Sequence, residues 1–70
     1  NQHKEEIEYL QQGIQQLESN KDYAGMLQNY ERLLELQPDN EDARDKVDQL
    51  QAKIDFQERA REWRRNQNKN

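Results

Sequence analysis

Residues 20–43 read NKDYAGMLQNYERLLELQPDNEDA, and this stretch holds the clearest pattern in the chain. Tyr23, Met26 and Tyr30 recur at spacings of three and four residues, and a leucine pair follows, so one face of a helix is apolar. Pro38 ends that helix because it disfavours helical geometry at the preceding residue and has no backbone N–H. The stretch therefore predicts a helix, a short turn and the start of another helix.

A second apolar stripe lies before this stretch and a third lies after it. The earlier one has spacings of three, four and three, which predicts a helix over residues 4–19 that ends in the turn after Ser19. The later one is followed by no Gly or Pro, which predicts a helix from residue 41 to about Arg65. The two stripes are, in order, Ile7, Leu10, Ile14 and Leu17, and Ala43, Val47, Leu50 and Ile54.

Short connections with capping residues separate the three predicted helices. Asp22 and Asn40 each stand just before a helix, where their side-chain oxygens can accept from free backbone N–H groups. Helices joined by only a few residues pack as antiparallel neighbours. The sequence therefore predicts an all-α fold, in which an antiparallel helical hairpin is followed by a long third helix.

Composition limits the chain to one small domain. It has 70 residues, of which 30% are hydrophobic and 37% charged, and a core of this size gives marginal stability. The absence of cysteine excludes disulfides and thiolate metal sites, and apolar runs no longer than pairs exclude a membrane-spanning helix in this segment. Because the chain begins with Asn1 and not Met, we expect it to be a fragment of a larger protein.

Residues 7–40 span 34 positions and resemble one tetratricopeptide repeat, a helix-turn-helix unit of that length. The matching positions are the apolar Leu10, the aromatic Tyr23 and Tyr30, and the terminal Pro38 within the run ERLLELQPDNEDA. The resemblance implies a unit over residues 1–40, a long capping helix over 41–65 and a flexible polar tail over 66–70. It also implies a protein-interaction module and no enzymatic activity.

Four positions depart from the pattern of that family. Gly13 comes one residue before the position where a small residue is usual, and Ile14 occupies that position. Met26 and Leu33 replace two alanines of the second helix, and such larger side chains predict a wider spacing between helices. The alternative is a three-helix bundle similar to microtubule-interacting and trafficking domains, which have a second helix in the style of DYAGMLQNYERLLE. Members of that family also bind proteins.

Residues suited to catalysis or metal binding are scarce. His3 has no second metal ligand at helical spacing, and it lies at the start of the chain. Asp42, Asp45 and Asp48 recur beside Glu41, but carboxylates along one helix face are usually solvated, and the EF-hand loop pattern is absent. We therefore expect no catalytic, cofactor-binding or metal-binding residues.

The third predicted helix carries a second apolar stripe. Phe56 and Trp63 lie about 200° and 180° around the helix from Ile54, and Ala52 lies close to them. If the helix does not fold its end back, this stripe has nothing in the chain to cover it. We therefore predict an interaction surface of Ala52, Phe56, Arg59, Trp63 and Arg64, with a protein partner or a second copy of the chain as its occupant and a homo-oligomer or coiled coil as one result.

The end of the chain is basic although the remainder is acidic. Residues 59–70 have a net charge of +4, whereas residues 1–58 have a net charge of −8. This end suits an acidic protein surface, or simply the C-terminal end of the helix dipole. Attachment to nucleic acid or an anionic membrane is the alternative function, which the acidic remainder disfavours. The basic residues are Arg59, Arg61, Arg64, Arg65 and Lys69.

The exposed face of the first helix is a further candidate surface. The resemblance places its residues along a peptide-binding groove, and none of them is basic, so a peptide bound there would be basic or recognised by amides. The sequence favours the simpler interpretation, a solvated face with no partner. The residues are Glu8, Gln11, Gln12, Gln15 and Glu18.

Overall fold

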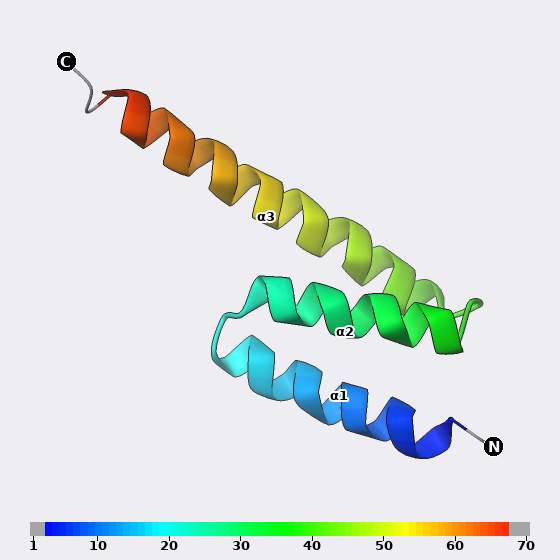
Figure 1. The fold of residues 1–70 in the computed structure, drawn as a ribbon. Helices are drawn as coiled ribbons and strands as arrows, with labels where there is room; N and C mark the ends of the chain where they lie inside the picture. Colours follow the sequence, from blue (N-terminus) through cyan, green and yellow to red (C-terminus); the bar gives the residue numbers. More distant parts are fainter. Residues whose placement is uncertain (1–2, 68–70) are drawn as a thin grey trace.

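The computed structural model describes residues 3–67 and contains three helices in that range, with no strand. They are α1 (Lys4–Ser19), α2 (Tyr23–Leu36) and α3 (Glu41–Gln67), shown in Figure 1. The predicted all-α fold, a helical hairpin followed by a long third helix, is confirmed. α2 packs against α1 on one side and α3 on the other, and each helix runs antiparallel to the one before it (Figure 1).

The turn between α1 and α2 is held by backbone hydrogen bonds and one capping side chain. Lys21 adopts a left-handed conformation with φ 57°, and its N–H donates to the Glu18 carbonyl at 3.0 Å. The Asp22 N–H donates to the Leu17 carbonyl at 2.9 Å, so the last carbonyls of α1 are satisfied. Asp22 then caps α2, as predicted, because its carboxylate accepts from the Gly25 N–H at 3.0 Å.

The turn between α2 and α3 is organised by Asn40. Its side-chain oxygen accepts from the Ala43 N–H at 3.0 Å, which confirms it as the cap of α3. Its side-chain nitrogen donates to the Gln37 amide oxygen at 2.9 Å, while Arg44 donates to the Pro38 carbonyl at 3.1 Å. These bonds set the direction in which α3 leaves the hairpin.

We predict that Asn40→Ala destabilises the fold by about 1 kcal/mol, because the Ala43 N–H loses its acceptor at the start of α3. Thermal melts followed by circular dichroism will measure the loss. Asn66→Ala, in the exposed last turn of α3, is the matched control and should melt like the wild type. Equal melting temperatures for all three proteins would contradict the capping role.

The core consists of two small clusters, and each takes one buried residue from every helix. Leu10, Leu33 and Ala43 form the first, beside the α2–α3 turn. The second lies further along the helices and contains Ile14, Met26 and Leu50. Each cluster includes one residue of α2, so α1 and α3 both need α2 to complete their part of the core.

The larger residues that depart from the repeat pattern all lie in this core. Ile14, Met26 and Leu33 are buried, and Gly13 lies close to Asn29 of α2. A Cβ atom at Gly13 would stand 2.9 Å from the side-chain nitrogen of Asn29, which donates to the Leu10 carbonyl at 3.4 Å. The small residue one position early therefore leaves room for the Asn29 side chain between the two helices.

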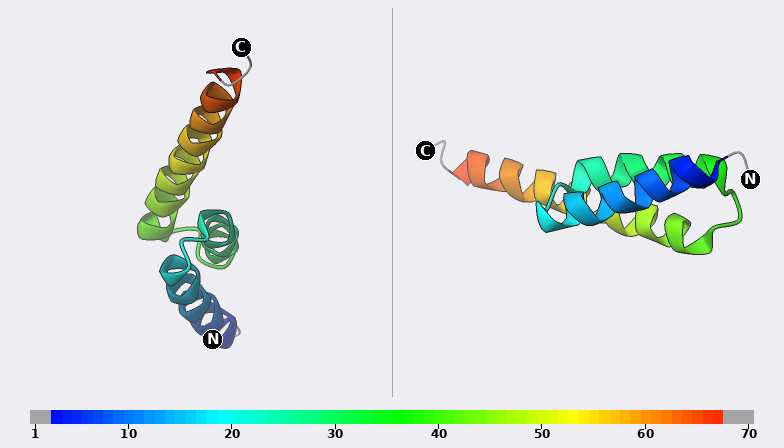
Figure 2. Two further views of the ribbon diagram at one scale, coloured as in Figure 1. Left: turned by 90° about the vertical axis from the view of Figure 1, so that its left-hand side faces the viewer. Right: turned by 90° about the horizontal axis from the view of Figure 1, so that it is seen from below.

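α3 is much longer than the hairpin beside it. Its 27 residues extend about 40 Å, and its second half projects past the hairpin without folding back (Figures 1 and 2). The radius of gyration is 15.3 Å, against about 11 Å for a compact chain of this length. The protein is therefore elongated.

The predicted boundary of the polar tail was two residues too early. α3 continues past Arg65 to Gln67, because no helix-breaking residue stands between them, so residues 66 and 67 are helical. The remainder of the predicted tail, residues 68–70 with Lys69, lies outside the described residues. Within residues 3–67, no helix has both the length and the apolar composition to cross a membrane.

Candidate interaction surfaces

One candidate surface is the side of α3 that faces away from the hairpin. We call Ala52, Phe56 and Trp63 the aromatic face, and all three side chains are exposed. Phe56 is 72% exposed and Trp63 is 62% exposed, although Leu50 on the opposite side is only 7% exposed. Helical geometry causes this division, because residues nine apart, such as Ala43 and Ala52, lie on opposite sides of a helix.

Basic side chains border the aromatic face. By helical position, Arg59 lies on one side of the line from Phe56 to Trp63 and Arg64 on the other. Arg64 also lines a shallow hollow of about 380 Å³, together with Phe56 and Ala60. The aromatic face and its two bordering arginines therefore lie on the same side of α3.

Two other cations near this end turn toward the hairpin. The Lys53 ammonium stands 4.3 Å from the centre of the Tyr23 ring, a favourable cation–π distance. Arg61 lines a hollow with Asp22 and Tyr23 at the start of α2, and it also lines the hollow beside Phe56. By helical position, Arg59 and Arg64 are the two arginines that flank the line from Phe56 to Trp63.

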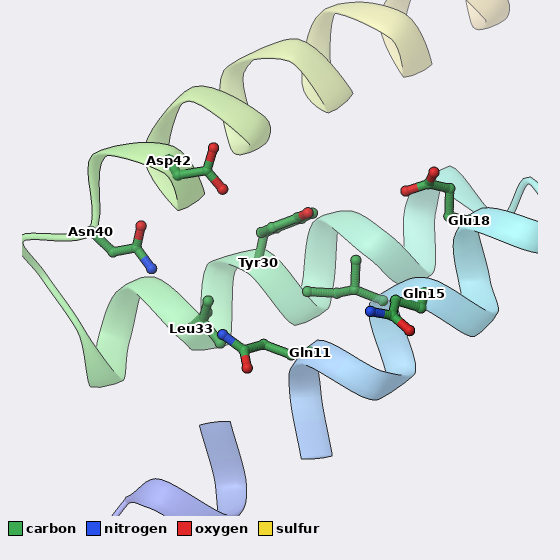
Figure 3. Close-up of a pocket in the computed structure, with 8 residues that line it drawn as sticks. Gln11, Gln15, Glu18, Tyr30, Leu33, Asn40 and Asp42 are labelled. Carbon is green, nitrogen blue, oxygen red and sulfur yellow. The ribbon is translucent and has the colours of Figure 1, made fainter. Parts of the chain in front are cut away.

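The second candidate surface is a hollow of about 320 Å³ where the three helices converge, which we call the acidic groove. Figure 3 shows α1 contributing one wall and the start of α3 the other, with α2 between them. Ile14 and Leu33, both buried, lie at its base. The remaining lining residues are polar, namely Gln11, Gln15, Glu18, Tyr30, Asn40 and Asp42.

The groove is electrostatically negative. Burial raises the pKa of the Tyr30 phenol above its usual value, and the nearby carboxylates of Asp42 and Glu18 raise it further. The phenol therefore stays protonated and can donate a hydrogen bond. No lining residue is basic, and the neighbouring Arg44 is bonded to a carbonyl outside the groove.

The only ion pairs in the described range also lie outside the groove. Arg32 of α2 donates to Glu6 of α1 at 2.7 and 3.3 Å and to Glu35 at 2.9 Å. The hydrogen bond from Arg32 lowers the pKa of Glu6. The groups are exposed, so the pairs serve chiefly to orient α1 on α2.

The residues predicted on the face of α1 separate into two groups. Gln11 and Gln15 line the groove together with Glu18, whereas Glu8 and Gln12 are exposed and are not among its lining residues. The contributions of α2 and α3 to the groove were not predicted, because Tyr30 and Asn40 already had roles as core and cap. The sequence did not indicate that their polar groups line a groove, because this depends on how the three helices pack.

One exposed aromatic residue was not predicted. Tyr9 of α1 is 75% exposed, although it stands between the stripe residues Ile7 and Leu10. Its position, 100° around the helix from Leu10, already places it off the apolar face. It lies on neither the aromatic face nor the acidic groove.

Among residues 3–67, no three His, Cys, Asp or Glu side chains are grouped so that they could hold a metal ion. His3 and the carboxylates at the start of α3 are therefore not part of such a group. What these surfaces offer is apolar area, hydrogen-bonding groups and opposite charges.

Comparison of the chain with protein-family models, with curated proteins and with solved structures found no match.

Proposed function

We propose that this chain is a non-enzymatic protein-interaction and assembly module that binds through the aromatic face of α3. The observation that carries the proposal is the exposure of Phe56 and Trp63 on a helix whose opposite side is already packed on the hairpin. Burying each of these side chains fully would stabilise a complex by roughly 1.5–3 kcal/mol. The partner is another protein or a second copy of this chain.

The way the module is built supports this proposal. α3 is held to the hairpin by its first half, through Ala43 and Leu50, so its second half presents Phe56 and Trp63 on an already ordered helix. A partner therefore does not need to order this segment on binding, which preserves affinity. We further propose that the hairpin is a single tetratricopeptide-like unit and that α3 replaces the neighbouring repeats that would normally stack on it.

We predict that Phe56→Glu combined with Trp63→Glu abolishes concentration-dependent association while the fold is retained. Both side chains are exposed, so the monomer loses no core contact. Sedimentation velocity over a concentration series will measure association, and circular dichroism will measure folding. Trp63 emission in the wild type should shift to shorter wavelength as concentration rises, because the indole leaves water.

The control adds the same two charges elsewhere. Gln16→Glu with Gln28→Glu changes exposed residues on α1 and α2 and should associate like the wild type. Equal association of the aromatic-face variant and the control would contradict the proposal. A wild-type chain that remains monomeric, with Trp63 freely quenched by iodide at every concentration, would contradict assembly through this face.

Attachment to nucleic acid or an anionic membrane is the second candidate function. The exposed Arg59 and Arg64 beside Trp63 favour it, because arginines can bind phosphates while an indole stacks or inserts. Binding to a single-stranded oligonucleotide or to phosphatidylserine vesicles should then weaken steeply with salt. Binding through apolar burial should change little with salt. A titration from 50 to 500 mM NaCl separates the two functions.

A further inference from the structure

The acidic groove and the end of α3 are complementary in charge. The groove presents two carboxylates, on Glu18 and Asp42, and its lining contains no basic residue. The end of α3 presents Arg59 and Arg64 on either side of the exposed Trp63. Each surface therefore lacks the groups that the other supplies.

The two surfaces cannot meet within one chain. Asp42 and Trp63 lie on the same continuous helix, and the 21 residues between them correspond to about 32 Å along its axis. The end of α3 projects away from the hairpin (Figure 1). Any contact between these surfaces must therefore join two molecules.

From this arrangement we propose that the acidic groove of one copy receives the end of α3 from a second copy. Trp63 enters the hollow against the amides of Gln11 and Gln15, and Arg59 and Arg64 pair with Glu18 and Asp42. A volume of about 320 Å³ suits one large side chain and not a whole helix. This inference rests on the proposed function, since it names the occupant of the aromatic face.

The geometry of this contact has a consequence for assembly. Groove and helix end are different surfaces, so a pair joined by one such contact still has one free groove and one free helix end. Association of this type either continues head to tail or closes when copies exchange helix ends. Pairing of two aromatic faces does not involve Glu18 or Asp42, so the dependence of association on the groove carboxylates distinguishes the two arrangements.

The test uses two variants that neutralise one surface each. Glu18→Gln with Asp42→Asn removes the charge of the groove, and Arg59→Gln with Arg64→Gln removes the charge of the helix end. Sedimentation velocity and light scattering should show that the wild type associates as its concentration rises. Each variant alone should associate about tenfold or more weakly, because its charged surface meets only a neutral one. An equimolar mixture should form a heterodimer that grows no further, because only one charged pair of surfaces remains.

A third variant controls for any effect of Asp42→Asn on the start of α3, because it changes the groove without changing α3. Gln11→Lys with Gln15→Lys places positive charge in the groove from exposed positions of α1, and it should weaken association as the neutral groove does. Circular dichroism melts confirm that every variant is folded.

The inference would be overturned if Glu18→Gln with Asp42→Asn and Gln11→Lys with Gln15→Lys both associated as strongly as the wild type. It would also be overturned by a mixture that associates no more strongly than its components. In these cases the double variant Phe56→Glu with Trp63→Glu decides separately whether the proposed function stands.

Discussion

Leu50→Ala is expected to destabilise the protein by about 2–5 kcal/mol, because it truncates a buried side chain at the point where the three helices meet. Leu50 is 7% exposed and supplies the α3 side of the cluster that contains Ile14 and Met26. Truncation leaves a cavity in that cluster, and a domain of this size has only a few kcal/mol of stability. Circular dichroism should show a melting temperature lower by roughly 10 °C or more.

The matched control is Gln49→Ala, one residue earlier on the exposed side of α3. It makes the same change to alanine on the same helix but removes no core contact, so its melting temperature should stay within a few degrees of the wild type. Unchanged melting of Leu50→Ala would mean that α3 does not pack on the hairpin in solution. The aromatic face would then have no rigid support.

Ala43→Leu is expected to destabilise the protein by about 1–3 kcal/mol, because it inserts a larger side chain where there is no space. Ala43 is 1% exposed, the lowest value in the core, and it packs against Leu10 and Leu33. The added atoms should push the start of α3 away from α2. Thermal melts will measure the loss, and faster amide hydrogen exchange at the start of α3 will show where it acts.

Ala52→Leu is the control for this substitution. It makes the same change on the same helix, but Ala52 is exposed on the aromatic face, so the fold should be as stable as the wild type. The melts are carried out at low protein concentration because a larger apolar face can promote association. Equal stability of Ala43→Leu and Ala52→Leu would contradict the close packing of α3 on α2.

The three helices, and their ends except the last end of α3, were determined by the sequence alone. The spacing of Leu10, Ile14 and the other stripe residues defines one face of each helix. This spacing can be recognised in the sequence because an α-helix has 3.6 residues per turn. The caps Asp22 and Asn40 bond to backbone N–H groups three residues away. The opposite placement of Ile54 and Phe56, about 200° apart, also follows from the rotation per residue within one helix. All of these features depend on interactions a few residues apart.

The acidic groove was decided only by the tertiary structure. It joins Gln11 of α1, Tyr30 of α2 and Asp42 of α3, which are far apart in sequence and meet only because the helices pack as they do. That packing depends on the room that Gly13 leaves for Asn29 and on the fit of Ala43 against Leu33. Tyr30 illustrates the difference. The apolar spacing correctly places it toward the core, but only the neighbouring helices leave its phenol half-buried beside two carboxylates.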